Sequence, residues 1–284
     1  MKSNKSIFLT VKDHSVSDEK FELLYNEDFG MLETFPQPLP ERILDYYNSE
    51  DYISHTDSKR NLFEKAYHVV KSISLKRKHR IISSFSKNGN NLLDFGCGTG
   101  DFLKVAQKAG WNVKGIEPNE KARELANLKI ENSVYSTDQL LKFQKCTFDV
   151  ITLWHVLEHL HNLDDHIKKF KSLLTAEGVL IIAVPNYKSY DASYYKEFWA
   201  AYDVPRHLWH FSKSSISKLF AKHQMKVDKT LPMVFDAFYV SILSEKYKSG
   251  FMNPIKAFWI GILSNLKAKR NGEYSSLIYI IKNS

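Results

Sequence analysis

Three alternate glycines, Gly96, Gly98 and Gly100, lie directly after a short apolar segment and directly before a helical pattern. Glycine lets a backbone turn sharply and approach a ligand closely, because no Cβ stands in the way. Such a turn between a strand and a helix is typical of a loop that binds a nucleotide-like cofactor. An ordinary tight connection between a strand and a helix could contain the same glycines, so the downstream residues must decide between these two interpretations.

The register of the glycines separates two classes of cofactor. A dinucleotide-binding loop has glycine at its first, third and sixth positions, and the sixth position here is Asp101. An acidic residue, Asp94, instead stands two positions before the first glycine. A second acid, Glu117, ends the next expected strand, where a carboxylate can accept both hydroxyl groups of a ribose. The plainer interpretation of Glu117 is a charge at a strand end that faces water.

Histidines follow another expected strand, in residues 148–161. The strand should end near Leu153 and Trp154, and His155 and His159 then follow four residues apart. This spacing predicts two imidazoles on one face of a helix, which a metal site could use. Because the HExxH arrangement is absent, a packed or hydrogen-bonded pair is favoured, and we expect no metal ligand in the chain.

A second histidine segment spans 202–212, after a tyrosine-rich loop. Arg206 could bind a carboxylate or a phosphate, and His207 or His210 could remove a proton from a nucleophile near neutral pH. Ser212 has the position of an N-cap for the next helix. The aromatic and histidine side chains could also simply pack, so a substrate role and a packing role are both compatible with this segment.

The elements that must position these residues alternate along the chain. Alternating strands and helices are typical of a parallel sheet covered on both faces. Seven strands are expected, at 92–95, within 111–117, and at 133–135, 148–153, 179–184, 226–231 and 276–281. Helices are expected from Asp57 into a long amphipathic segment, and at 102–109, 120–128, 165–174, 214–223, 236–247 and 254–269. The predicted fold class is therefore α/β.

Three segments resemble one enzyme family. Residues 94–100 resemble motif I of the class I S-adenosylmethionine-dependent methyltransferases. The Val-Leu-Glu-His stretch at 156–159 resembles the strand-four motif of the branch that contains the ubiquinone-pathway O-methyltransferases and the type 11, 12 and 23 groups. Residues 202–212 resemble a stretch of the type 23 group. The resemblance implies a Rossmann-like, mostly parallel sheet of seven strands, with helices on both faces and an antiparallel last strand.

The resemblance also implies S-adenosylmethionine as the methyl donor, with S-adenosylhomocysteine as the product. The positions expected to bind the cofactor are Asp94, Gly96, Cys97, Gly98, Gly100, Glu117, Pro118, Asp138, Leu153 and Trp154. Asp138, beside Thr137, is the nearest match to the residue that contacts the adenine, and an ordinary helix cap is its alternative. The aromatic face of Trp154 would suit a sulfonium cation. The expected catalytic residues are His155, Arg206, His207 and His210.

The methyltransferase domain should span 57–284 and carry two additions. Residues 1–56 are rich in aromatics and lack clean periodicity, which predicts an N-terminal extension that could cap the substrate. A helical insertion is expected at about 235–270, and its second, strongly apolar stretch closes with Lys267, Lys269 and Arg270. A membrane-surface helix is conceivable there. A helix buried against the sheet, or lining a substrate cavity, is favoured because the polar face is not consistently basic.

Composition indicates a globular protein, which we expect in the cytoplasm. Hydrophobic residues make up 43% of the 284 residues and charged residues 25%, and no apolar run approaches the roughly 18 to 20 residues of a membrane span. The first residues lack a signal-peptide core. Two cysteines are too few for a disulfide framework or a cysteine zinc site. The net charge of +8 could suit an anionic partner, but its densest run, at 76–80, falls at a helix end that favours cations.

The expected function is methyl transfer to a small or amphiphilic acceptor, such as a quinone, a phenol, or a sugar-like or lipid-like molecule, with oxygen as the favoured acceptor atom. One alternative is an NAD-dependent Rossmann oxidoreductase, which the glycine register disfavours. The other is an S-adenosylmethionine-binding protein without turnover. Nucleic acid is not a favoured acceptor, because the Asn/Asp-Pro-Pro-Tyr motif of amino-methylating enzymes does not follow the fourth strand. The sequence predicts no oligomeric state.

Overall fold

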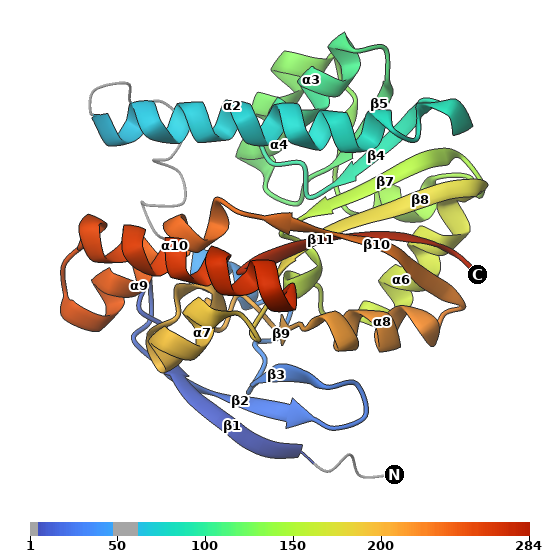
Figure 1. Ribbon diagram of the computed structural model, residues 1–284. Coiled ribbons are helices and arrows are strands. Elements are labelled where there is room, and N and C mark those ends of the chain that lie inside the picture. The colour runs from blue at the N-terminus through green and yellow to red at the C-terminus, as the bar shows by residue number, and fades with distance from the viewer. Residues whose placement is uncertain (1–4, 48–61) are drawn as a thin grey trace.

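The computed structural model describes residues 5–47 and 62–284, and in these ranges a seven-stranded sheet runs through the middle of the molecule (Figure 1). In spatial order its strands are β10 (Met225–Met233), β11 (Ser276–Asn283), β8 (Leu174–Pro185), β7 (Phe148–Trp154), β4 (Asn91–Phe95), β5 (Asn112–Ile116) and β6 (Val134–Tyr135). The pairs from β8 to β6 are parallel, whereas β11 is antiparallel to both of its neighbours. The predicted sheet and its antiparallel last strand are confirmed.

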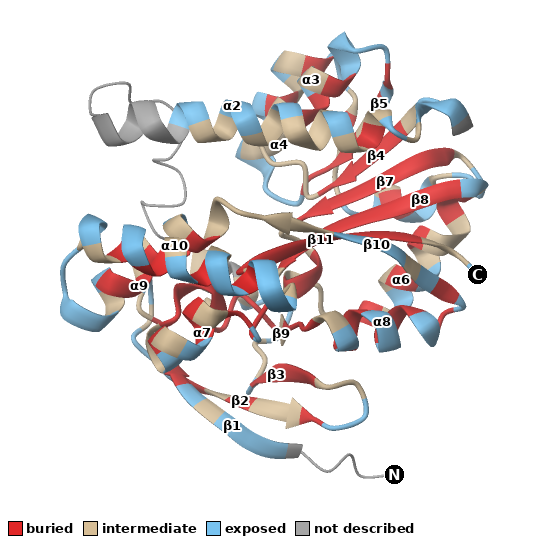
Figure 2. Cartoon of the chain, in the orientation of Figure 1, coloured by how far each residue is buried: buried red, intermediate tan, exposed pale blue. Residues whose placement is uncertain are grey.

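Helices cover both faces of this sheet, because successive side chains of a strand point to opposite faces and both sets are apolar here. On one face lie α2 (Leu62–Ser83), α3 (Asp101–Lys108) and α4 (Glu120–Ile130), and on the other lie α5 (Gln139–Lys142), α6 (Leu163–Leu173) and α8 (Lys213–Ala221). Every residue of β7 is buried, and Figure 2 shows the central strands as the most buried part of the fold. The N-cap expected at Asp57 lies outside the described residues.

Residues that we expected to form an extension without regular structure build a second sheet. Its order is β1 (Lys5–Lys12), β2 (Lys20–Asn26), β3 (Met31–Phe35) and β9 (Trp209–His210), all antiparallel. The interpretation that this region lacks clean periodicity is wrong for β2. Phe21, Leu23 and Tyr25 alternate with polar or outward positions, and the first two are buried. The strand β9 belongs to the 202–212 segment, so the second sheet carries one of the expected functional segments.

The expected helical insertion forms α9 (Asp236–Ser249) and α10 (Pro254–Asn271), which pack on each other and on α7 (Tyr190–Tyr195). A Cβ added to Gly261 would lie 2.6 Å from the Phe238 ring, so α9 and α10 approach closely. The expected burial of α10 holds for one face only, because Ile255, Phe258 and Trp259 are exposed. Among the described residues, no helix has the combined length and apolarity that crossing a bilayer requires.

Candidate functional site

The glycine loop connects β4 to α3 with three left-handed residues. Gly96, Gly98 and Gly100 have φ angles of 77°, 53° and 75°, which residues with a side chain rarely adopt. A Cβ on Gly96 would lie 2.4 Å from Val156 Cγ2, and one on Gly100 would lie 2.7 Å from Ile130 Cδ1. At Gly98, no described atom lies within 4 Å of such a Cβ. The outer two glycines therefore permit close packing, whereas the middle one faces open space.

Glu117 lies at the end of β5, next to this loop. Its Oε2 accepts a hydrogen bond from the Gly98 N–H at 2.8 Å, and its Oε1 accepts one from the Asn119 N–H at 2.9 Å. Burial raises the pKa of Glu117, and these two hydrogen bonds oppose that rise. The carboxylate is thus fixed by backbone donors on both sides, in the orientation that the glycine loop imposes.

Asp94 lies at the heart of the site and is 2% exposed. Its Oδ1 accepts a hydrogen bond from the Thr152 hydroxyl at 2.6 Å, and burial raises its pKa to about 7. The charge of Lys78, a partly exposed residue of α2, opposes the rise in the Asp94 pKa, and partial burial lowers the pKa of Lys78 itself. The Lys78 ammonium lies 4.5 Å from the centre of the Trp154 ring. A carboxyl group with mixed protonation therefore lies directly behind the glycine loop.

The side chains of Leu153 and Trp154 lie in the two packing layers of the sheet. Leu153 is fully buried against the α6 side, and the Trp154 ring packs edge-on against Phe102 of α3, at 5.6 Å between ring centres. The indole Nε1 of Trp154 has no hydrogen-bond partner among the described residues. Both side chains shape the floor of the site from within the core.

The remaining expected cofactor residues lie around the loop in different environments. The Cys97 sulfur would lie 2.7 Å from a Cβ added to Gly115, and burial raises the pKa of the thiol. Pro118 follows Glu117, and its carbonyl accepts a hydrogen bond from Arg123. Asp138 begins α5 without capping it and is exposed. Hydrogen bonds from Lys142 and Ser136 hold the pKa of Asp138 at about 2.

His155 follows β7 in a left-handed conformation, with φ of 58°, and precedes a single 3-10 turn at Leu157–His159. The prediction that His155 and His159 share a helix face is therefore wrong. His155 Nε2 lies 3.2 Å from Asp236 of α9, and Nδ1 lies 3.4 Å from Glu158. Burial lowers the pKa of His155, but the two carboxylates outweigh it and raise the pKa to about 10. The two carboxylates therefore favour the protonated, cationic form of this imidazole.

Glu158, His159 and His207 form a cluster in which one ligand atom of each residue lies within 4.8 Å of the other two. The two imidazole rings meet edge to face, 4.6 Å apart. Burial, together with the neighbouring His207, lowers the pKa of His159 to about 4. Sequence reasoning considered the two histidines in separate segments and overlooked Glu158. The signal was present in the Val-Leu-Glu-His stretch, but only the fold brings His207 to it.

Arg206 and His210 lie beside this cluster and bind other parts of the protein. The Arg206 guanidinium pairs with Asp203, with Nε at 3.0 Å from Oδ2, and donates to the Tyr46 carbonyl at 2.8 Å. The His210 Nε2 lies 3.0 Å from the Thr34 hydroxyl, and burial lowers the pKa of that ring. Both residues attach the N-terminal sheet to the 203–210 loop, and of the four expected catalytic residues His207 alone joins the cluster.

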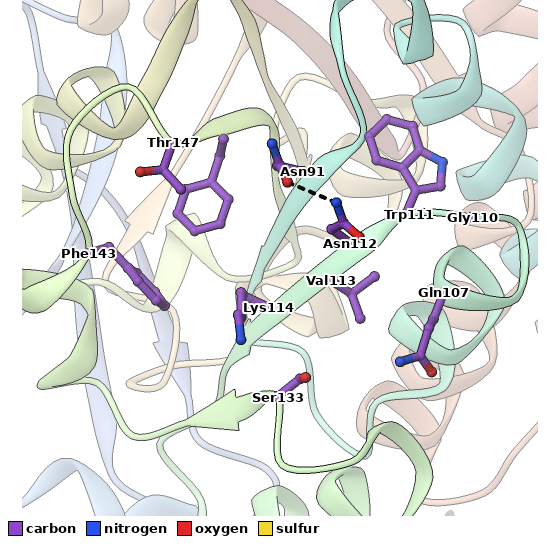
Figure 3. Close-up of a pocket in the computed structure, with 11 residues that line it drawn as sticks. Asn91, Gln107, Gly110, Trp111, Asn112, Val113, Lys114, Ser133, Phe143 and Thr147 are labelled. Atoms are coloured by element: carbon purple, nitrogen blue, oxygen red, sulfur yellow. Dashed lines mark hydrogen bonds between the residues drawn. The ribbon is translucent and has the colours of Figure 1, made fainter.

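A depression of about 640 Å³ opens elsewhere, and Figure 3 shows its lining. Asn91 and Asn112, which share a hydrogen bond there, are the first residues of β4 and β5. The depression therefore lies at the amino ends of the parallel strands, whereas the glycine loop follows their carboxyl ends. Ligands of open α/β sheets bind at the carboxyl ends, so we do not assign the cofactor to this depression.

Comparison with protein families decides the class. A family model described as a methyltransferase domain, of type 23, matches residues 60–230. The chain belongs to this methyltransferase family. Residues 60–230 are therefore an S-adenosylmethionine-dependent methyltransferase domain, as the glycine register indicated, and the match gives no support to the alternative of an NAD-dependent oxidoreductase. The expected enzyme class and cofactor are confirmed.

Relatives of this methyltransferase match over part of their length. A ubiquinone biosynthesis O-methyltransferase of Pelagibacter ubique is 36% identical over 102 residues, which are 34% of this chain and 42% of that protein. An uncharacterized methyltransferase of Anoxybacillus flavithermus is 28% identical over 141 residues, covering 48% of this chain and 61% of that protein. The chain spans about half the length of the curated relatives it matches.

Solved structures share the fold of this methyltransferase at low identity. Magnesium protoporphyrin IX methyltransferase from Synechocystis PCC 6803 with bound S-adenosylhomocysteine has a TM-score of 0.56 at 16% identity, over 86% of this chain and all (100%) of that one. Geranyl diphosphate C-methyltransferase from Streptomyces coelicolor A3(2) has a TM-score of 0.53 at 16% identity, over 81% and 89%. Because the names of these two enzymes carry different acceptors, the shared fold leaves the acceptor undefined.

Proposed function

We propose that S-adenosylmethionine binds at the carboxyl edge of the sheet, between the glycine loop and the turn after β7. In this arrangement Glu117 accepts the ribose hydroxyls, and the open space at Gly98 lets the backbone approach the cofactor. Asp138, at the end of β6, lies toward the adenine. The other proposed contacts come from Asp94, Gly96, Cys97, Gly100, Pro118, Leu153 and Trp154, largely through the backbone and the floor of the site.

We infer that the reaction is O-methylation of a small or amphiphilic acceptor. The observation that carries this proposal is the cluster that His207 forms with Glu158 and His159. The latter two residues lie on the turn that follows Val156, whose side chain contacts Gly96 of the cofactor loop. An oxygen nucleophile must lose a proton as it attacks the methyl group, and carboxylate and imidazole groups serve that need. The O-methyltransferase relative supports the same acceptor atom.

In this proposal the protein contributes mainly by alignment. The sulfonium already activates the methyl carbon, and positioning of reactants can be worth about 7 to 11 kcal/mol. His207 is the proposed proton acceptor of the four expected catalytic residues. The cation at His155 does not suit a base, and it would instead stabilise negative charge near the acceptor. Arg206 and His210 would position the loop that carries His207.

We further propose that the described part of the N-terminal extension, residues 5–47, and the insertion at about 235–270 form a cap over the acceptor. Aromatic side chains of α7 and the following turns pack with β1, β2 and α9 in one cluster, including the buried rings of Tyr195, Trp199 and Tyr202. The Tyr47 hydroxyl of the N-terminal region lies 3.0 Å from His159 Nδ1. An amphiphilic acceptor would place its apolar part against this cap and its oxygen at the cluster.

The test is methyl transfer from labelled S-adenosylmethionine to matched acceptors, in three groups that offer phenolic or alcoholic oxygen, amine nitrogen, or carbon. We expect label on oxygen with the first group, and little with the others. Glu117→Gln should reduce turnover by weakening cofactor binding, while Glu158→Gln should reduce it with cofactor binding intact. Label on nitrogen or carbon alone would overturn the proposal. Saturable cofactor binding without transfer to any fraction of a cell extract would favour a binding protein.

A further inference from the structure

We propose that Glu158, His159 and His207 bind one divalent transition-metal ion of the Zn²⁺ class. One carboxylate and two imidazoles, with ligand atoms within 4.8 Å of one another, form the donor set of a three-ligand zinc site. Within residues 5–47 and 62–284, this is the one group of three histidine, cysteine or acidic side chains whose ligand atoms all lie within 4.8 Å of one another. The sequence analysis considered a metal site only between His155 and His159 and expected no metal. The proposal departs from that expectation.

Backbone carbonyls fix the orientation of both imidazoles. The Nδ1 of His159 lies 2.9 Å from the Arg206 carbonyl, and the Nδ1 of His207 lies 2.9 Å from the Ala201 carbonyl. A carbonyl oxygen can only accept, so Nδ1 carries the hydrogen in each ring and Nε2 keeps its lone pair. Metal-ligating histidines commonly donate their other N–H to a carbonyl or carboxylate in this way. The two rings are therefore held as ligands through Nε2.

Glu158 supplies the second, independent observation. Its side chain is fully buried, yet neither carboxylate oxygen has a hydrogen-bond partner among the described residues. His155 lies 3.4 Å away without hydrogen-bond geometry and is shared with Asp236. The ion pair with His155 offsets part of the cost of burying this carboxylate, but its oxygens still lack hydrogen bonds, and buried carboxylates normally pair or coordinate metals. A cation between Glu158 and the two rings removes that cost.

The geometry requires a modest contraction on binding. Zinc bonds of about 2.0 to 2.1 Å in a tetrahedral site place ligand atoms roughly 3.3 Å apart. Because the three ligand atoms already lie within 4.8 Å of one another, they must approach by at most about 1.5 Å. Three protein ligands leave a fourth position open, as in catalytic zinc sites. Imidazole donors favour Zn²⁺, Cu²⁺, Fe²⁺ or Ni²⁺ over Mg²⁺, Ca²⁺ and Mn²⁺.

With the ion bound, the acceptor oxygen would occupy the open position and release its proton under the charge of the metal, so His207 would serve as a ligand in place of the proton acceptor proposed above. The turn that carries Glu158 and His159 also carries Val156, which contacts the cofactor loop at Gly96. This part deepens the proposed O-methylation and rests on it. The metal site itself does not, since binding can be measured without any acceptor. Failure of the metal test and failure of the methylation test are therefore separate outcomes.

The test is calorimetric titration of the full chain, free of affinity tags and stripped with a chelator, with ZnCl₂. We expect one equivalent of Zn²⁺ to bind, and more than about tenfold weaker binding in Glu158→Gln and in His207→Gln. Co²⁺ should give the intense visible absorption of a tetrahedral site in the wild type and lose it in both variants. His166→Gln is the matched control, because the His166 Nδ1 also contacts a backbone carbonyl, that of Asn162, at 2.9 Å.

Two outcomes would overturn the site: no saturable Zn²⁺ binding to the wild-type chain, or equal binding by Glu158→Gln, His207→Gln and His166→Gln. Circular dichroism and binding of S-adenosylhomocysteine establish that each variant is folded. If Glu158→Gln does not fold, His159→Gln and His207→Gln carry the same comparison. If the cluster acts only as an acid–base relay, the protein will bind no Zn²⁺ and will keep normal turnover in the presence of a chelator.

Discussion

The substitution Gly98→Ala tests whether Gly98 is needed for the stability of the fold or for contact with the cofactor. The Gly98 φ of 53° lies in the left-handed region, and no described atom lies within 4 Å of an added Cβ. The only cost to the free protein is therefore conformational, about 1 to 2 kcal/mol. For a chain of this size, each kcal/mol lowers the melting temperature by about 2 to 4 °C.

Cofactor binding should suffer more than stability. If the loop holds S-adenosylmethionine against its backbone, the new methyl group occupies the space that the cofactor needs. We expect the Kd for S-adenosylhomocysteine to rise by about 10- to 100-fold, which corresponds to roughly 1.4 to 2.7 kcal/mol. Isothermal titration of the folded variant measures this change, and thermal unfolding without ligand measures the stability cost.

Gly110→Ala is the matched control. Gly110 also has a positive φ, of 90°, and no described atom lies within 4 Å of its added Cβ. It follows the C-terminal end of α3, however, whereas the glycine loop precedes the N-terminal end of that helix. It should lose at least as much stability and keep the wild-type Kd. Unchanged affinity in Gly98→Ala, or an equal loss in Gly110→Ala, would refute the placement of the cofactor against Gly98.

Three further substitutions test the same site. The pKa of Asp94 is about 7 in the fold and 3.8 without it, so its protonated form stabilises the protein fully below about pH 4, and this contribution, up to about 4 kcal/mol, is lost as pH rises to 7. Urea unfolding should show that loss in the wild type and not in Asp94→Asn; parallel pH profiles would contradict it. Glu117→Gln replaces a charged acceptor of two backbone hydrogen bonds, at about 1.5 to 3 kcal/mol each, so the Kd for S-adenosylhomocysteine should rise at least tenfold, and an unchanged Kd would count against the ribose role. Gly96→Ala should lower stability by about 1 to 3 kcal/mol through overpacking against Val156, with partial recovery when Val156→Ala is added; a wild-type melting temperature for the single variant would show that the contact is not limiting.

Local sequence was sufficient for the elements of the main sheet. Strand and helix periods repeat within a few residues, so β4, β7 and α3 appear within one or two residues of their expected bounds. The N-cap predicted at Ser212 is confirmed, since its side chain accepts from the Ser215 N–H. The glycine register depends on neighbours in the chain, and it indicated the cofactor class before any contact was known.

Predictions failed where a residue's environment comes from distant segments. The four-residue spacing of His155 and His159 predicted a shared helix face, but Gly96 packs against Val156 and the turn is 3-10. The sequence left open whether Arg206 binds a substrate anion or packs within the protein, and only the fold shows its pairing with the Asp203 carboxylate. Short-range patterns do not contain these contacts.

The sequence by itself determined the order of strands and helices in the seven-stranded sheet and its covering layers, the loop at 96–100 and hence the methyl donor, because each depends on spacing along the chain. Only the tertiary structure decided which side chains meet beyond the loop. Glu158 and His207 are forty-nine positions apart in the sequence. The Leu208 N–H donates a hydrogen bond to the Glu158 carbonyl, and this bond brings the two segments together. A cluster of buried polar groups is defined by such long-range backbone pairing, which the one-dimensional pattern does not encode.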